Sequence, residues 1–124
     1  MAGRRVVAVS VGWKHNLAIT ADGDVWSWGD GKTSQLGHGT EENQGRPKRV
    51  EALSGRRVVA VAAGNSHSLA ATAEGAVFSW GYGRGLCLGH GEDESNQSLP
   101  KKIEVWAAEI AEARAGAVCP YPVC

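Results

Sequence analysis

The heptapeptide Gly-Arg-Arg-Val-Val-Ala-Val occurs twice in this chain, at residues 3–9 and again at residues 55–61. The similarity continues beyond it: residues 3–39 and 55–91, compared at an offset of 52, are identical at 23 of 37 positions. A long repeat with a fixed period is typical of solenoids and propellers, in which each unit packs against its neighbours. The chain therefore holds two copies of one structural unit.

The repeat also predicts the domain organisation. We place the first unit at residues 1–54 and the second at residues 55–106. A third unit starts at the same spacing, because Gly116 lies 52 residues after Gly64. The pattern then fails, so we expect residues 107–124 to be the degenerate start of a third repeat, or a short tail that is irregular or helical.

Composition narrows the classes of protein to which the chain can belong. Its 13 Lys and Arg residues balance 13 Asp and Glu residues, so net charge gives no reason to bind nucleic acid or an anionic membrane. No apolar run reaches the roughly 18 residues of a membrane span, and none resembles a signal peptide. Three cysteines do not make a disulfide framework. We expect an intracellular protein of the cytoplasm or nucleus that is not secreted.

Within each unit, apolar and small or polar residues alternate with a period of two, which predicts β-strands. The pair Asp22-Gly23 is a hairpin-turn signal, because glycine adopts a positive φ at little cost. The strands expected in the first unit are residues 7–11, 16–19 and 25–28, with a fourth, shorter strand that begins within residues 46–50. Three to four antiparallel strands with no helix between them make one propeller blade or half of a sandwich.

Several segments together identify a family. They read Val-(Ser/Ala)-x-Gly-x-x-His-(Asn/Ser)-Leu-Ala, Thr-Ala-(Asp/Glu)-Gly-x-Val-(Trp/Phe)-Ser-Trp-Gly, Leu-Gly-His-Gly and Pro-x-x-(Val/Ile). Over about residues 3–106 the chain resembles the repeat of the regulator of chromosome condensation (RCC1) family. The resemblance implies blades of a β-propeller. We therefore expect an all-β fold: a partial β-propeller of about two four-stranded antiparallel blades.

The resemblance implies several functions. Members of the family include the exchange factor for the Ran GTPase, the plant UV-B photoreceptor and accessory domains of large ubiquitin ligases. We expect a non-enzymatic protein–protein interaction module that is part of a larger regulatory protein. The alternative is a guanine-nucleotide exchange factor for a Ran-like small GTPase. A photoreceptor-like or ubiquitin-ligase-associated propeller is a lower alternative.

Two blades also leave open sheet edges and uncovered apolar faces. The family propeller has seven blades, which at this period need about 350 residues. Either the chain is a fragment of a longer protein, which we expect, or copies of it associate to close a ring.

The loops are where the two units diverge, and variable loops on a rigid scaffold are the usual place for binding. Trp13 is of special interest, because its segment resembles the Gly-Trp-Arg-His-Thr segment of the UV-B photoreceptor, with Lys14 in place of the arginine. We interpret it as a loop tryptophan at the surface or in a partner contact. The residues expected to contact a protein partner are Trp13, Lys14, Lys32, Gln35, Arg46, Asn65, Arg84, Leu86 and Gln97.

Glycines, histidines and a tryptophan recur at equivalent positions, which is typical of structural contacts that every unit repeats. No carboxylate or cysteine recurs beside the histidines at metal-ligand spacing, so we expect no metal, no cofactor and no catalytic residue. Both recurring tryptophans are expected in the core. The structural residues are Gly12, His15, Gly23, Trp28, Gly29, Gly37 and His38 in the first unit and Gly64, His67, Gly75, Trp80, Gly81, Gly89 and His90 in the second.

Overall fold

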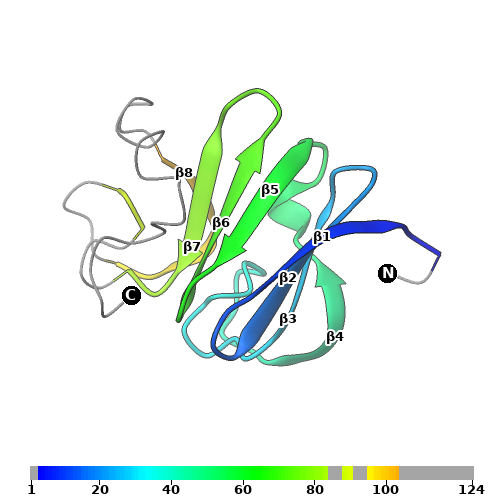
Figure 1. Ribbon diagram of the computed structural model, residues 1–124. Helices are drawn as coiled ribbons and strands as arrows, with labels where there is room; N and C mark the ends of the chain where they lie inside the picture. Colours follow the sequence, from blue (N-terminus) through cyan, green and yellow to red (C-terminus); the bar gives the residue numbers. More distant parts are fainter. Residues whose placement is uncertain (1–2, 84–87, 91–94, 104–124) are drawn as a thin grey trace.

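The computed structural model describes residues 3–83, 88–90 and 95–103, which form two four-stranded antiparallel sheets (Figure 1). In the first sheet the strands lie in chain order: β1 (Val6–Val11), β2 (His15–Thr20), β3 (Val25–Gly29) and β4 (Gln44–Arg49). The second sheet repeats this order with β5 (Val58–Ala63), β6 (His67–Thr72), β7 (Val77–Gly81) and β8 (Gln97–Lys102). A short 3-10 helix, η1 (Glu51–Leu53), precedes β5. The predicted all-β fold of two four-stranded units is confirmed, and the expected tail at 107–124 lies outside the described residues.

The hairpin between β2 and β3 turns where the sequence predicts. Gly23 has a φ of +88° and its N–H donates to the carbonyl of Thr20 at 2.9 Å. Gly75 repeats the turn between β6 and β7 with a φ of +93°. A side chain with a Cβ adopts such a φ only with strain, which explains why glycine occupies both positions.

The outermost strand of each sheet contains a proline. β4 begins at Gln44, two residues before the predicted start, and includes Pro47. Proline has no N–H to donate to a neighbouring strand, so it is tolerated at a sheet edge and not in the centre. β8 contains Pro100 in the same way.

The core lies between the two sheets. Strands β1 and β2 of the first sheet pack against β5 of the second, as Figure 1 shows. The junction, as we call this contact between the sheets, is filled by apolar side chains that are almost completely buried. They are Leu17, Ile19, Val25, Val50 and Leu53 from the first 53 residues of the chain, and Val58, Ala70, Phe78 and Trp80 from the second sheet.

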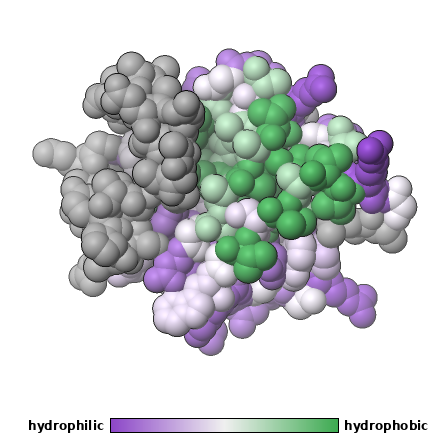
Figure 2. All heavy atoms as spheres, in the orientation of Figure 1, coloured by the Kyte–Doolittle hydropathy of each residue, from purple (hydrophilic) through white to green (hydrophobic). Residues whose placement is uncertain are grey.

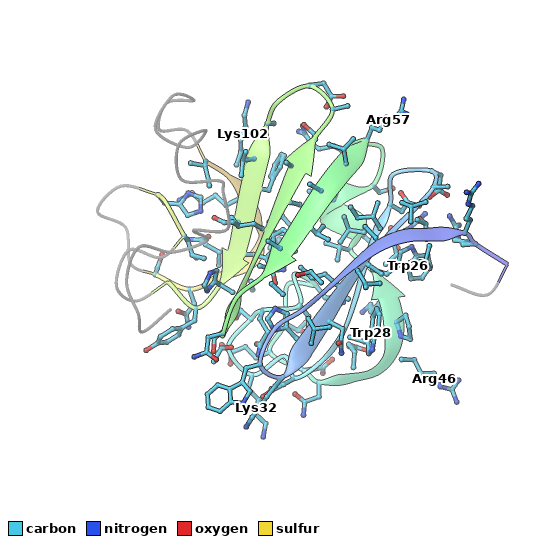
Figure 3. The ribbon with its side chains drawn as sticks, in the orientation of Figure 1. Trp26, Trp28, Lys32, Arg46, Arg57 and Lys102 are labelled. Carbon is cyan, nitrogen blue, oxygen red and sulfur yellow. The ribbon has the colours of Figure 1, made fainter. Side chains whose placement is uncertain are left out.

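The expectation that both recurring tryptophans are core residues is wrong for one of them. Trp80 is fully buried in the junction, whereas Trp28 is only half-buried. Trp28 lies on the side of the first sheet that faces away from the second (Figure 3), where no other sheet of the described residues covers it. Apolar side chains also lie on the surface over β1 and β5 (Figure 2), among them Val9 and Val11 of β1.

Candidate interaction surfaces

A chain of hydrogen bonds joins the two sheets across the junction. Ser68 donates its hydroxyl hydrogen to the carbonyl of Gln35 at 2.8 Å, and Trp80 Nε1 donates to the same carbonyl at 2.9 Å. His15 Nε2 lies 3.0 Å from Ser68 Oγ. Because the single hydroxyl hydrogen is committed to Gln35, Nε2 must carry the hydrogen and donate to Ser68. This arrangement places His15 in the neutral tautomer with its hydrogen on Nε2.

Two of the recurring glycines make room for the recurring histidines. A Cβ on Gly12 would overlap the imidazole ring of His15, and a Cβ on Gly64 would overlap that of His67. Each glycine also closes its turn, since its N–H donates to the carbonyl of that histidine. The pairing of Gly and His three residues apart is therefore a steric requirement of the turn.

The buried histidines are held neutral. Burial lowers the pKa of His15 from its ordinary value of 6.5 to about 4, and burial also lowers the pKa of His67. Desolvation disfavours the charged imidazolium, and for His15 the opposing effects of a hydrogen bond with His67 and of the charge on Asp30 do not offset the loss of water. Neither histidine carries charge at pH 7, which suits structural hydrogen bonding better than ionic recognition.

A second pair of histidines fixes the long loops. His38 Nε2 lies 2.9 Å from Ser27 Oγ, which itself donates to the carbonyl of Leu36 at 2.7 Å. His90 Nε2 lies 2.9 Å from Ser79 Oγ in the equivalent arrangement of the second sheet. Burial is also the main reason why the pKa of His38 is lowered. Each of these histidines ties a loop back onto a strand.

The exposed loop residues lie at one end of the sheets. In an antiparallel sheet the turns after the first and third strands share an edge, so the turns at 12–14 and 64–66 and the loop at 30–43 form what we call the loop end. Of the expected contact residues, the loop end carries Trp13, Lys14, Lys32 and Asn65, all exposed, while Arg46 is exposed on β4 and Gln97 is half-buried on β8 (Figure 3). Arg84 and Leu86 lie outside the described residues.

Trp13 is the most prominent of these side chains. It is 70% exposed, and the Nζ of Lys14 lies 5.5 Å from the centre of its indole ring. Its turn is fixed by two hydrogen bonds, from the N–H of Gly12 to His15 O and from that of Asp30 to Lys14 O, both 2.8 Å. A large aromatic side chain therefore projects into solvent from a well-defined backbone.

Gln35 is not on the loop surface where we expected it. Only 3% of it is exposed, and its carbonyl accepts the two junction hydrogen bonds described above. Its side-chain Oε1 accepts from the N–H of Thr33 at 2.9 Å and so holds its own loop. The structure places Gln35 inside the junction.

The opposite end of the first sheet carries a charged network that the sequence pattern did not predict. Arg4 pairs with Asp22 and lies 3.3 Å from Asp24. Arg49 bridges Asp24 at 3.3 Å and Glu51 at 3.1 Å. A signal was available, because two aspartates flank the turn glycine and Arg4 belongs to the repeated Gly-Arg-Arg. A hollow of about 350 Å³ beside this network is lined by Ala21, Asp22, Asp24, Gly55, Arg56 and Arg57, which carry both signs of charge.

Within residues 3–83, 88–90 and 95–103, no group of three or more His, Cys, Asp or Glu side chains is arranged to hold a metal ion. No helix in the described part of the chain is long and apolar enough to cross a membrane.

Comparison with known proteins agrees with the geometry. The pattern of the regulator of chromosome condensation (RCC1) repeat matches residues 22–71 and 74–117, and a second form of it matches residues 6–35. The human E3 ubiquitin-protein ligase HERC2 is 46% identical over 98 residues, 79% of this chain. The ultraviolet-B receptor UVR8 of Arabidopsis thaliana is 38% identical over 101 residues, 82% of this chain.

A solved structure gives the same result. Yeast RCC1 (Prp20), crystallised bound to Kap60, superposes with a TM-score of 0.77 and 25% identity over 86% of this chain. The chain spans 2% of HERC2, 23% of UVR8 and 26% of the yeast protein, so each relative is far longer. Since the repeat pattern matches most of its length and its two sheets match solved blades, the chain belongs to the regulator of chromosome condensation (RCC1) repeat family.

Proposed function

We propose that the chain is a non-catalytic protein–protein interaction module of a larger intracellular regulatory protein, and that it contacts its partner through the loop end. The observation that carries this proposal is Trp13, whose indole is 70% exposed on a fixed turn. Tryptophan is enriched among the residues that dominate interface energies, and a fixed backbone lowers the entropy lost on binding. Asn65 occupies the equivalent turn of the second blade, so the anchor belongs to the first blade alone.

The neighbouring loop supports the proposal because its own side chains hold it in shape. Asn43 Oδ1 accepts a hydrogen bond from the N–H of Gly31 at 2.9 Å, and Asp30 Oδ1 accepts one from the N–H of Lys32 at 2.9 Å. Lys32 is exposed on the same loop end as Trp13. A preorganised loop next to an exposed anchor is the arrangement that binding surfaces on rigid scaffolds use.

The relatives support a protein partner in general terms. Yeast RCC1 was crystallised bound to the protein Kap60, and HERC2 is a much longer ubiquitin-protein ligase. The loops that differ between blades make the choice of partner specific to each protein, whereas the fold is shared.

The test begins with proteins cross-linked to the purified chain in a cell extract, which are identified and then titrated one by one. For a true partner, Trp13→Ala should weaken binding at least about tenfold, because it removes an interface anchor. The matched control is Arg57→Ala, which truncates an exposed side chain at the opposite end of the blades (Figure 3) and should leave binding unchanged. Equal losses in both variants, or binding that ignores Trp13, would remove the loop end as the contact surface.

The same protein distinguishes an interaction module from an exchange factor. We expect the release of labelled GDP from a Ran-type GTPase to be as slow with micromolar chain as without it. Acceleration of release would favour the exchange-factor alternative over the module proposed here.

A further inference from the structure

The Gly-Arg-Arg segment that opens each unit places one arginine on an aromatic ring of its own blade. In the first blade, the guanidinium carbon of Arg4 lies 5.4 Å from the centre of the Trp26 ring. In the second blade, the guanidinium carbon of Arg56 lies 4.7 Å from the centre of the Phe78 ring. The two pairs are equivalent at the offset of 52. Attraction between the cation and the ring face restricts the positions that each guanidinium samples.

The two equivalent arginines differ in their ion pairs. Arg4 Nη1 donates to Asp24 Oδ2 at 3.3 Å, so one guanidinium contacts a ring and a carboxylate at the same time. The planar guanidinium allows this, because its N–H groups lie at the edge and its face is free for the ring. In the second blade, Ala76 stands at the position of Asp24. Arg56 makes no ion pair or hydrogen bond through its side chain within the described residues. The second blade therefore has the guanidinium on its ring without the carboxylate.

The hairpin turn of the second blade does not supply the missing partner. In the first blade, Asp22 is held on the turn, because Thr20 donates its hydroxyl hydrogen to it and Arg4 pairs with it. Its equivalent in the second blade is Glu74, which is exposed and makes no ion pair or hydrogen bond through its side chain within the described part of the chain. The N–H groups of Arg56 are therefore open to an acceptor from outside the blade.

Arg56 borders the hollow beside the charged network. This hollow of about 350 Å³ is lined by residues of the turn at 21–24 in the first blade and of the segment 55–57 that leads into the second. Sites for small ligands enclose about 300–1,000 Å³, so a side chain of a partner fits into it. Both walls belong to two consecutive blades, which makes the hollow a feature of the junction itself. It lies at the end of the blades that Arg57 marks in Figure 3, opposite the loop end.

The unpaired charges around the hollow are positive. Both aspartates that line it are already paired: Arg4 pairs with Asp22 and Asp24, and Arg49 lies 3.3 Å from Asp24. The two arginines of the segment 55–57 also line it, and neither has an ion pair within the described residues. The charges left without a partner therefore favour an anionic group in the hollow.

We propose that Arg56 and the hollow form a second interaction surface, which takes an acidic side chain from a segment of a protein partner. The partner's carboxylate accepts hydrogen bonds from Arg56, as Asp24 does from Arg4, while Phe78 stays on the face of the guanidinium. One exposed ion pair is weak alone, so the ligand is a segment that also contacts the walls of the hollow, and not a free ion. Arg57 adds little, because no contact within the described residues fixes its side chain.

The experiment titrates the purified chain with two short peptides whose ends are blocked. One peptide has three glutamates flanked by glycines, and the other has glutamines in their place. The Nε–H signal of Arg56 in nitrogen NMR, assigned by its loss in Arg56→Gln, should shift to saturation with the glutamate peptide and stay in place with the glutamine peptide. Arg56→Gln should weaken binding of the fluorescently labelled glutamate peptide about tenfold, because it removes hydrogen bonds assisted by charge.

A second variant gives the second blade the arrangement of the first. Ala76→Asp places a carboxylate where Asp24 stands, so it should occupy Arg56 and also weaken binding of the glutamate peptide about tenfold. The matched control is Ala76→Asn, which adds a side chain of the same size without the charge and should keep most of the wild-type affinity. Trp13→Ala, at the loop end, should bind the peptide as the wild-type chain does. Far-UV circular dichroism checks that every variant remains folded.

Four results would overturn the proposal. Equal affinity for the two peptides would show that the chain does not recognise carboxylates. Unchanged affinity in Arg56→Gln would show that the peptide binds elsewhere. Equal affinity of Ala76→Asp and Ala76→Asn would show that Arg56 is not the group that takes the carboxylate. A shift of the Arg56 signal by sodium acetate as large as that by the peptide, at equal carboxylate concentration, would indicate an adventitious ion only. None of these results bears on partner binding at Trp13, so the two proposals fail separately.

Discussion

The two blades have the same strand order and register, yet they bury equivalent residues differently. Val58 is 2% exposed and Trp80 fully buried in the second blade, whereas Val6 is 41% exposed and Trp28 half-buried in the first. The sequences at these positions are identical. The difference therefore comes from the neighbour: the face of the second blade that carries Trp80 packs against the first blade, whereas no other sheet of the described residues covers the face of the first blade that carries Trp28. An apolar residue at such a repeat position is therefore buried only where a neighbouring blade packs against it.

The largest effect expected from this difference is on the two tryptophans. Trp80→Ala should lower the free energy of unfolding by about 3–5 kcal/mol, because it empties a fully buried site and removes the hydrogen bond to Gln35. Trp28→Ala should cost about 1–2 kcal/mol, because its side chain is only partly buried. Urea unfolding at a chain concentration low enough to keep single chains measures both. Equal costs would mean that the first blade buries its tryptophan in solution as the second does.

The next largest effect is a dependence of stability on pH. The buried histidines cause it, and the exposed carboxylate of Asp22 does not contribute in the same pH range. His15 has a pKa of about 4 in the fold against 6.5 when unfolded, so between these values the unfolded chain binds a proton that the folded chain excludes. Stability should be constant above about pH 6.5 and fall as the pH drops toward 4, by about 3 kcal/mol from His15 alone. The lowered pKa values of His38 and His67 add to the loss in the same direction.

The measurement is the free energy of unfolding in urea at several pH values from 7.5 to 4.5. His15→Gln should reduce the slope in this range, since glutamine does not titrate, and should leave the contributions of His38 and His67. Asp22 does not interfere, because a hydrogen bond from Thr20 lowers its carboxyl pKa below 3.8. A slope that is the same with and without His15 would contradict the burial of this imidazole in the neutral form.

The sequence was sufficient to predict the framework for a physical reason. Gly12 and His15 must occur together in every unit because the glycine leaves the space that the ring fills, so the repeat reveals them. Gly23 recurs as Gly75 because the hairpin needs a positive φ. Contacts that each blade makes in the same way leave the same residues at the same spacing, and the pattern can be read without coordinates.

The junction partners could not be predicted in this way. Gln35 takes part through its backbone carbonyl, and every residue has one, so its identity gave no signal and its place in a variable loop suggested a binding residue. Ser68 accepts from His15, but its equivalent in the first blade is Asn16, so the position does not repeat. The charged network of Arg4, Asp22 and Asp24 was also missed: Arg4 lies in the repeated Gly-Arg-Arg, but Asp24 is replaced by Ala76 in the second unit.

The smallest of the three effects separates Ser68 from Asn16, the same position in the two blades. Ser68→Ala should lower the free energy of unfolding by about 1–2 kcal/mol, because it leaves the His15 Nε2 hydrogen buried without an acceptor while Trp80 still donates to Gln35. Asn16→Ala should change it by less than about 0.5 kcal/mol in single chains, because Asn16 is half-buried on a face that no blade covers. Urea unfolding of dilute chain measures both, and nitrogen NMR of His15 reports the lost hydrogen bond directly. A large cost at Asn16 would mean that its side chain already has a buried partner within the chain.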